Sequence, residues 1–431
     1  MMQAIVLDGP PYPDPHVTLP LVREENLVTG VPELTRQLGP LTSLETDLLT
    51  LAAAIFALDL AAVRGEREDI ARDLYLTVPV VNYAAFIHHA DDLANILYTL
   101  SCDNWTIEFA RRPGVPENTT AWPERAGKTL LFSGGLDSLA AAVEEIEAGT
   151  HLQLASHYTG NPITRACQKR LHTYLEGIAG GSVPRVSVKA GGRNRGALAF
   201  PDDKAREPTQ RTRSFLFLVI GAIAARRSGH HEVLMIAENG QMAIHLPLTA
   251  ARIGAFSTHT AHPEFVDTMQ SFLSALLSFQ LTVHNPFLYR TKGECVGHLV
   301  AAHTLAVADS VSCWKSARQA HSHCGICIPC LIRRIAIEHH GLTLPEYERD
   351  LLVEDIAVLP TNDTGKRNIS ELAEFAAWFD GTQPAAAIEE MFPDLYNEHF
   401  NKEEAIAMYG RFAVEARGVL ARYPGARSLL T

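Results

Sequence analysis

Between residues 128 and 305, short apolar stretches alternate with longer helical patterns, and this alternation limits the possible folds more than any other feature. Each expected strand leads into an expected helix, so successive strands need crossover connections, pair in parallel and carry helices on both faces. The sequence therefore predicts an α/β fold with a Rossmann-like parallel sheet, which binds ligands at the carboxyl ends of its strands. In chain order, starting with a strand, the expected elements occupy residues 128–132, 138–147, 152–157, 165–178, 183–188, 215–226, 233–237, 266–279, 281–284 and 292–305.

The regions on either side of this core follow a less regular pattern. A stretch with three prolines and a glycine, residues 112–124, is typical of a linker. We therefore expect an N-terminal α+β extension of unassigned role over 1–125, the core domain over 126–344 and a mostly helical C-terminal extension over 345–431. The elements expected outside the alternating part are a helix at 48–63, strands at 74–81 and 105–111, and helices at 331–340, 369–378 and 403–419.

Composition and charge narrow the class of protein. The 431 residues include 37 Lys and Arg against 49 Asp and Glu, which gives a net charge of −12, and 47% of them are apolar. This balance excludes a disordered chain and argues against a general nucleic-acid binder, because phosphates are neutralised by an excess of Lys and Arg. Residues 1–20 lack the apolar core of a signal peptide, and the apolar run 215–225 is shorter than the ~20 residues of a membrane span. We expect a cytoplasmic protein with no membrane partner.

A glycine-rich segment occupies the first strand-to-helix junction. It consists of Ser133, Gly134, Gly135, Leu136, Asp137 and Ser138. Glycines let the backbone approach phosphate oxygens, and the amides at the start of the helix point outward at the positive end of its dipole. Asp137 beside an anion implies a divalent cation between the two, and no Lys-Ser/Thr pair follows to make a Walker A loop. The segment is thus either a phosphate-binding loop or a plain tight turn with a Ser or Asp helix cap.

Four of the seven cysteines are clustered, which in a chain of this length indicates a metal site rather than disulfide bonds. They are Cys313, Cys324, Cys327 and Cys330. Four thiolates form the closed tetrahedral shell of a structural zinc ion, and Gly325 permits a tight turn around it. An iron–sulfur cluster and unligated core cysteines are the alternatives. His321 and His323 are either competing ligands or, more simply, exposed loop histidines.

The glycine-rich segment resembles the SGGxDS signature of the PP-loop ATP pyrophosphatases, which cleave ATP to AMP and pyrophosphate. Together with the cysteine cluster, it is similar to the QueC family of that group, the 7-cyano-7-deazaguanine synthases, over residues 126–340. The chain departs from the family pattern at Ser214, where the family has Asn, and at Thr260, where it has Cys. Further similar segments are 213–218 (RSFLFL), 257–266 (STHTAHPEFV), 285–286 (NP), 291–294 (TKGE), 312–314 (SCW) and 324–333 (CGICIPCLIR).

The resemblance implies an enzyme that uses ATP, Mg²⁺ and Zn²⁺. It implies that the glycine-rich segment binds the nucleotide phosphates, that the four cysteines hold zinc, and that Asp137, Arg213 and Lys292 are catalytic. The substrate that it implies is 7-carboxy-7-deazaguanine. The carboxylate of this molecule is adenylated and attacked by ammonia to give an amide, and a second adenylation with loss of AMP gives the nitrile.

The size and divergence of the chain are similar to those of the QueC-like proteins of bacterial antiviral operons, in particular the QatC component of Qat systems. That resemblance implies a partner protein from the same operon, whose amine would receive the activated deazaguanine in place of ammonia. The alternatives are a PP-loop enzyme that modifies tRNA and a non-catalytic nucleotide-binding scaffold of a defence complex.

Segment 189–213 follows the third expected strand and is rich in basic residues. They are Lys189, Arg193, Arg195, Lys204, Arg206, Arg211 and Arg213. The segment is either a mobile lid that clamps pyrophosphate or the substrate carboxylate, or a solvated loop. Arg213, at a helix start, is the residue for which we favour the clamp. Lys292 either approaches phosphate or is a solvated lysine at another helix start.

Residues 238–241 (Glu-Asn-Gly-Gln) end the fourth expected strand, at the edge of the sheet where ligands bind. Their amides either contact the edge of a guanine-like base or form a polar turn with Gly240 at positive φ. His259 and His262 are the remaining candidates for contact with the substrate.

Overall fold

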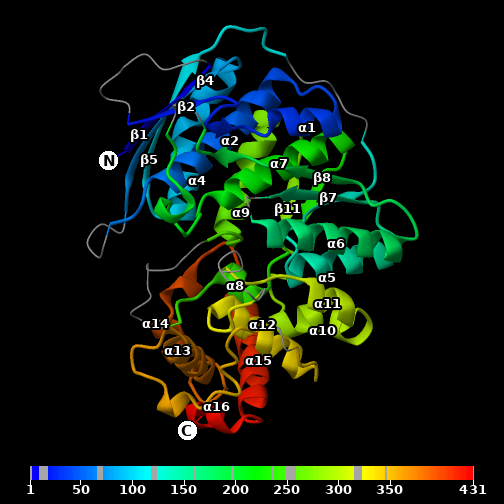
Figure 1. Cartoon of the computed structure of the whole chain (residues 1–431), viewed down its shortest axis with the longest axis vertical. Helices are drawn as coiled ribbons and strands as arrows, with labels where there is room; N and C mark the ends of the chain where they lie inside the picture. Colours follow the sequence, from blue (N-terminus) through cyan, green and yellow to red (C-terminus); the bar gives the residue numbers. More distant parts are fainter. Residues whose placement is uncertain are drawn as a thin grey trace.

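The computed structural model describes most of the chain, and Figure 1 shows two β-sheets with their helices above a group of helices that contains the C-terminus. Both larger sheets are parallel and flanked by helices, which confirms the predicted α/β fold. The described residues are 2–8, 18–65, 71–117, 124–158, 161–195, 199–234, 237–248, 259–314, 323–344 and 347–430.

The central sheet has five parallel strands in the order β11-β10-β6-β7-β8. They are β6 (Lys128–Leu131), β7 (Leu152–His157), β8 (Arg185–Val188), β10 (Glu232–Leu234) and β11 (Thr282–His284). All five lie where strands were predicted, although residues 235–236 of the fourth fall outside the described residues. The winding reverses between β6 and β10, and the crevice at such a reversal is where open parallel sheets bind ligands.

Helices cover both faces of this sheet. Successive residues of one strand enter different cores: Leu130 packs in the cluster with α5 and α6, and Leu131 in the cluster with α7 and α9. This alternation follows from the two-residue period of a strand, and it explains why the expected strands are apolar throughout. The four helices are α5 (Leu136–Glu147), α6 (Pro162–Ala179), α7 (Arg213–Ser228) and α9 (Pro263–Leu277).

The helix predicted over 292–305 is two helices in the structure. α10 (Lys292–Ala302) ends at His303, whose backbone leaves the helical conformation (φ −129°, ψ 38°), and α11 (Thr304–Asp309) follows. The His303 imidazole hydrogen-bonds with side chains of α5 and α6. The prediction of one helix was wrong because a local pattern does not reveal such distant partners.

The chain up to residue 111 builds a second parallel sheet, in the order β2-β1-β4-β5, of which two strands were predicted. One face is covered by helices, while exposed and buried side chains alternate along β4 and β5, so the other face is open to solvent. The predicted helix 48–63 begins earlier, at Ser43. The elements are β1 (Met2–Leu7), β2 (Leu19–Val22), α1 (Val31–Leu38), α2 (Ser43–Ala61), β4 (Asp73–Val80), α3 (Tyr83–Phe86), α4 (Ala90–Ser101) and β5 (Asn104–Arg111).

The two sheets share one apolar core. α2 packs against α7 and α4 against α9, so the layers run sheet, helices, helices, sheet, helices (Figure 1). α2 is apolar nearly all round because it is enclosed between its own sheet and α7. Its buried Glu45 is neutralised by Arg226 of α7, at 2.6 Å. The segment predicted as an N-terminal extension therefore buries its helices on the central domain.

Part of the basic segment 189–213 is tied to the N-terminal unit. β9 (Gly191–Gly192) pairs antiparallel with β3 (Leu27–Val28), and Arg193 donates to two backbone carbonyls beside β3. Arg211 is buried and donates to the last carbonyl of α4 (2.8 Å). These contacts favour a fixed loop over a mobile lid for the described part of the segment.

The C-terminal helices form a second apolar core. The short α8 (Gly240–Ile244), which follows β10, joins this core, because Ile244 and Leu246 are buried in it and the Tyr409 hydroxyl accepts from the Leu246 amide (3.3 Å). The C-terminal extension thus packs on the chain that leaves the carboxyl end of β10. The helices of the extension are α13 (Thr364–Trp378), α14 (Ala385–Met391), α15 (Lys402–Leu420) and α16 (Pro424–Arg427), and α12 (Ile328–His339) precedes them.

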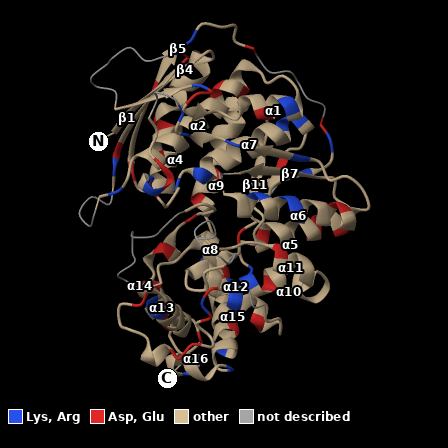
Figure 2. Cartoon of the chain, viewed as in Figure 1, with Lys and Arg blue, Asp and Glu red and all other residues tan. Residues whose placement is uncertain are grey.

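Charge is spread over both parts of the molecule. Figure 2 shows Lys and Arg interspersed with Asp and Glu along the described helices and strands, without one strongly basic face in this view. None of the helices in the described part of the chain is both long and apolar enough to cross a membrane.

Candidate functional site

The glycine-rich segment 133–138 lies between β6 and α5, at the carboxyl edge of the central sheet and beside the reversal of winding. Gly134 has φ +86°, and a Cβ there would come within 3.1 Å of α6 side chains, so both conformation and space favour glycine. The loop is fixed from two sides. Gln168 Nε2 donates to the Ser133 carbonyl (3.0 Å), and the Val311 amide donates to the Gly134 carbonyl (3.1 Å).

The first turn of α5 has no side-chain cap. Gly135 is the N-cap residue, and the hydroxyls of Ser133 and Ser138 hydrogen-bond to its amide (3.2 Å) and carbonyl (3.1 Å) respectively. The Ser or Asp helix cap that the plain-turn alternative includes is therefore not formed. Amides of a first turn have no intrahelical acceptor, and together with the positive end of the helix dipole they form an anion site.

Asp137, in this first turn, meets Lys292 at the start of α10. Lys292 Nζ lies 2.6 Å from Asp137 Oδ2, and the two side chains are only 9% and 8% exposed, so the alternative of a solvated lysine is wrong. Asn239, after β10, donates from Nδ2 to the same oxygen (3.0 Å). Asp137 Oδ1 is buried and has no hydrogen-bond partner among the described residues. The structure thus brings two of the three predicted catalytic residues together beside the glycine-rich segment.

The start of α10 is held by contacts that the sequence analysis missed. Thr291 and Glu294 form a capping box, and the Lys292 amide donates to Gln241 Oε1 (2.7 Å). Glu415 of α15 accepts a hydrogen bond from the Thr291 hydroxyl, and burial raises the pKa of this carboxyl to about 7. The C-terminal extension therefore helps to position Lys292, a role that no local pattern signals.

Residues 238–241 do not form the polar turn that was one of the two alternatives for this segment. Gly240 lies in the first turn of α8, without a positive φ, and a Cβ there would lie 2.2 Å from the Leu288 carbonyl oxygen. Close approach of the two backbones therefore explains the glycine. Asn239 and Gln241 are engaged with the lysine–aspartate pair just described, while Gln241 Nε2 is buried without a hydrogen-bond partner in the described part of the chain.

Glu238 brings a second carboxyl group to this edge of the sheet. Burial and the charge of Asp137 raise the pKa of Glu238 to about 8, against the opposing charge of Lys292. At neutral pH the Glu238 carboxyl therefore holds a proton. A buried carboxyl group with a raised pKa next to a second carboxyl group is typical of a functional site.

Arg213 lies at the start of α7, and no described contact joins it to the lysine–aspartate pair. It lies near the end of β7, where burial and the Arg213 charge lower the pKa of His157 to about 3. Burial also lowers the pKa of Arg213 itself, and its Nε has no hydrogen-bond partner among the described residues. A guanidinium with an unused donor at the ligand-binding edge is suited to a carboxylate or a phosphate.

His259 and His262 lie at the start of α9, with ring centroids 4.9 Å apart. His262 caps α9, because its Nδ1 accepts from the Glu264 amide (3.3 Å), and burial lowers its pKa to about 3. His259 Nδ1 lies 2.8 Å from the Thr99 carbonyl oxygen in the N-terminal unit. The contacts seen for both rings are structural.

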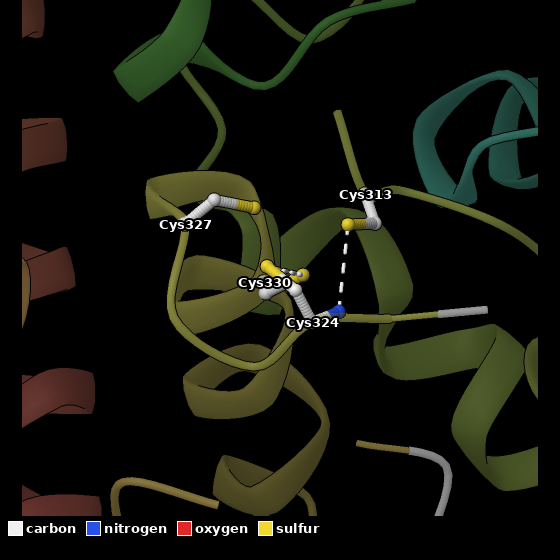
Figure 3. Close-up of side chains that lie close together, drawn as sticks. All are labelled: Cys313, Cys324, Cys327 and Cys330. Carbon is white, nitrogen blue, oxygen red and sulfur yellow. Dashed lines mark hydrogen bonds between the residues drawn. The ribbon is translucent and has the colours of Figure 1, made fainter. Parts of the chain in front are cut away.

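The four predicted zinc ligands converge, as Figure 3 shows. All four are buried, and their sulfur atoms lie within 4.8 Å of one another. Cys313 follows α11, Cys324 lies ahead of α12, and Cys327 and Cys330 lie at its start; the Cys324 amide donates to Cys313 Sγ (3.4 Å). Four converging thiols fit a tetrahedral zinc ion.

Two neighbours of this cysteine cluster bear on its ligand set. The predicted tight turn at Gly325 is confirmed, because this residue has φ +75°. There is also no room for a side chain, since a Cβ would lie 1.7 Å from the Arg349 carbonyl oxygen. Of the two alternatives for His323, that of an exposed loop histidine is wrong, because His323 is fully buried and its Nε2 accepts from the Ser312 amide (3.2 Å). His321 lies outside the described residues.

The cysteine cluster is linked to the glycine-rich segment. Val311, two residues before Cys313, donates to the Gly134 carbonyl. Arg333 of α12 is fully buried and donates to the Ser310 hydroxyl (2.7 Å). A metal ion in the cluster would therefore fix the chain on one side of the phosphate-binding candidate.

The fold and the site together define a class of protein: a doubly wound α/β chain with an open helix N-terminus at the reversal of winding and a four-thiol metal cluster. Within that class, the family model described as Queuosine biosynthesis protein QueC matches residues 256–341. The matched segment contains Lys292 and the four cysteines, whereas the glycine-rich segment lies before it. No curated protein matches the chain.

Proposed function

We propose that this protein uses ATP to adenylate the carboxylate of a deazaguanine-type small molecule. The observation that carries the proposal is the uncapped first turn of α5, which opens beside the buried Asp137–Lys292 pair. The QueC family segment supports it, because QueC is a family of ATP-hydrolysing enzymes in deazaguanine chemistry. A triphosphate needs backbone donors and positive charge, and both are present at this edge of the sheet.

Different residues of the site would contact different parts of the nucleotide and its Mg²⁺ ion. The first-turn amides of residues 136–138, which have no intrahelical acceptor, would donate to the phosphates, and the hydroxyls of Ser133 and Ser138 lie beside them. Asp137 Oδ1, buried and without a described partner, fits a Mg²⁺ ligand, and Mg²⁺ there would offset the negative charge of departing pyrophosphate. Lys292 adds a second positive charge, which its contact with Asp137 holds in place before substrate arrives.

The reaction proceeds through an acyl adenylate. A carboxylate oxygen of the substrate attacks the α-phosphorus of ATP, the bond from that phosphorus to the bridging oxygen breaks, and pyrophosphate leaves. A nitrogen nucleophile then attacks the carbonyl carbon, and AMP departs with the former carboxylate oxygen. Arg213, whose Nε has no hydrogen-bond partner among the described residues, would bind the substrate carboxylate or the pyrophosphate.

The nucleophile distinguishes two forms of this proposal. With ammonia, the product is the amide, and a second adenylation converts it to the nitrile. With an amine of an operon partner protein, the deazaguanine becomes attached to that protein, as in an antiviral system of the QatC kind. The adenylation step is common to both.

The test is release of pyrophosphate from ATP and Mg²⁺ in the presence of 7-carboxy-7-deazaguanine. In Asp137→Asn we expect the substrate-dependent rate to fall about 100-fold or more, because the site loses the carboxylate that would hold Mg²⁺ on the phosphates. Asp91→Asn, at an exposed position of α4, is the matched control and should keep the wild-type rate. Thermal melting of both variants shows whether they are folded.

Other outcomes would favour the alternatives. An undiminished rate in Asp137→Asn contradicts the proposal. Nucleotide binding by the wild type without pyrophosphate release, even with ammonium and the deazaguanine acid present, favours a non-catalytic scaffold. A rate that depends on added tRNA favours a tRNA-modifying enzyme.

A further inference from the structure

A second group of potential metal ligands lies at the other end of α5, away from the glycine-rich segment. Glu147 is the last residue of α5, His298 lies in α10, and His303 lies at the break between α10 and α11. Glu147 Oε2 is 2.8 Å from His298 Nε2, and its Oε1 is 3.1 Å from His303 Nε2. The three ligand atoms lie within 4.8 Å of one another.

The surroundings of His303 fix the orientation of its ring through a hydrogen bond at Nδ1. Tyr174 of α6 places its hydroxyl 2.8 Å from His303 Nδ1, with the two rings at 90°. A histidine that binds a metal through Nε2 carries its proton on Nδ1 and donates it to a neighbouring acceptor. The Tyr174 oxygen can accept that proton, so His303 can present its Nε2 lone pair while keeping this hydrogen bond.

The three side chains combine an anchored ligand with accessible ones. The His303 side chain is 10% exposed, whereas those of His298 and Glu147 are 48% and 40% exposed. An ion from solution can therefore reach the group, and water can fill the remaining coordination positions. His303, the least exposed of the three, is also the residue at which the helix predicted over 292–305 is interrupted.

We propose that Glu147, His298 and His303 form a second metal site, which takes Zn²⁺ or a similar borderline transition-metal ion. Two imidazole nitrogens and one carboxylate match the donors that Zn²⁺ prefers, whereas Mg²⁺ and Ca²⁺ prefer oxygen ligands alone. The donor set also differs from the four thiols of the cysteine cluster. An ion here would cross-link α5 to the α10–α11 junction, at the opposite end of α5 from the phosphate-binding candidate.

The test is the zinc content of the full-length, untagged protein after equilibration with Zn²⁺ and removal of unbound metal. With the cysteine cluster filled, we expect about two zinc ions per chain in the wild type and about one in His298→Ala/His303→Ala. His88→Ala, at an exposed position outside the group, is the matched control and should keep about two. One zinc ion per wild-type chain would overturn the proposal.

Two milder variants guard against a folding defect, because His303 is largely buried. His298→Ala changes an exposed side chain and should weaken Zn²⁺ binding at this site at least about tenfold. Tyr174→Phe keeps the ring but removes the acceptor of the Nδ1 proton, and should weaken binding about tenfold. Added Zn²⁺ should raise the melting temperature of the wild type more than that of His298→Ala. Unchanged Zn²⁺ affinity in His298→Ala would contradict the site.

Discussion

Both larger sheets of this protein are parallel and are covered by buried helices, yet these helices begin differently. In the N-terminal unit, α2 starts with a capping box: the Thr42 hydroxyl accepts from the Glu45 amide (3.2 Å), and the Glu45 carboxylate accepts from the Thr42 amide (2.9 Å). In the central sheet, α5 starts after Gly135 with no side-chain cap. The two sheets therefore differ in whether a side chain caps the first-turn amides, which are the groups that anions bind at helix starts.

The carboxylates at these two helix starts differ in the same way. Glu45 is fully buried and lies 2.6 Å from Arg226 and 3.3 Å from Arg227, so α7 neutralises it. Asp137 is also buried and paired with Lys292, but its Oδ1 has no hydrogen-bond partner among the described residues. The first arrangement closes a helix end for stability, and the second leaves capacity for a ligand.

The largest effect should come from breaking the ion pair at the open helix start. Lys292→Met leaves Asp137 buried without its counter-charge, which should lower the free energy of unfolding by roughly 3 kcal/mol. It also removes positive charge from the phosphates, and the rate of pyrophosphate release should fall about 100- to 1,000-fold. Denaturant unfolding and the release assay measure the two effects separately.

A double variant and a counterpart in the other sheet sharpen this prediction. Asp137→Asn/Lys292→Met removes both charges, so stability should recover while activity does not. Arg72→Met breaks a buried pair with Asp103 (2.6 Å) in the N-terminal unit and should lower stability without changing the rate per folded molecule. A near-wild-type rate in Lys292→Met would show that this lysine is structural.

The next effect should come from giving α5 the kind of cap that α2 has. In Gly135→Asp the carboxylate can accept from the first-turn amides and repel phosphate, so ATP affinity should fall about tenfold or more. The change fits sterically, because a Cβ at Gly135 would lie 3.4 Å from its nearest neighbour, Ser133 Oγ. Calorimetric titration with an ATP analogue measures the affinity.

Gly135→Ala is the matched control for this change. It adds the same Cβ without a capping group or a charge, so ATP affinity should stay near that of the wild type. Equal loss of affinity in both variants would mean that space at residue 135, rather than open amides, decides binding.

A smaller effect should appear as a pH dependence of stability. The folded-state pKa of Glu238, about 8, lies above its usual value of 4.5, so the folded chain holds this proton more tightly than the unfolded chain. The resulting stabilisation is full below about pH 4.5 and is lost as the pH rises toward 8. Glu238→Gln should flatten this part of the stability profile of the ligand-free protein. Glu403→Gln, an exposed glutamate of α15, should leave the slope unchanged, and an unchanged slope in Glu238→Gln would contradict the prediction.

The smallest effect should come from removing the side-chain cap at the start of α2. Thr42→Ala removes the hydroxyl of the capping box and should lower the free energy of unfolding by about 1 kcal/mol. Because Glu45 and its arginines still close that helix start, no nucleotide should bind there. We expect stability to be lower and ATP affinity to equal that of the wild type. Binding of a second nucleotide per chain would contradict the difference between the starts of α2 and α5.

The central part of the fold was predictable because its signals are local. Strands and helices alternate between β6 and α10, and each element needs only its own pattern of apolar residues and turn residues. In the N-terminal unit, β1 and β2 were missed; β1 pairs with β4, and β2 pairs with β1, at the edge of the sheet. The break at His303 was missed for a similar reason, since its side-chain partners lie on α5 and α6.

In the candidate site, too, the local features were predictable and the long-range contacts were not. The phosphate-binding candidate and the cysteine cluster were found because their residues are neighbours in sequence. The contacts that position them were not found: Glu415 reaches Thr291 from the C-terminal extension, and Gln241 reaches Lys292 from α8. Hydrogen bonds across such long stretches of chain leave no periodic or spacing pattern to read.

Three features are already visible in the amino-acid sequence, because short-range geometry dictates them: the glycine-rich junction, the spacing of the four cysteines and the alternation that makes a parallel sheet. Packing between distant elements leaves the first turn of α5 without a side-chain cap, brings Asp137 to Lys292, and gives Arg213 no described contact with either of them. Those outcomes depend on which distant groups satisfy a buried polar atom, and that is settled when the layers pack.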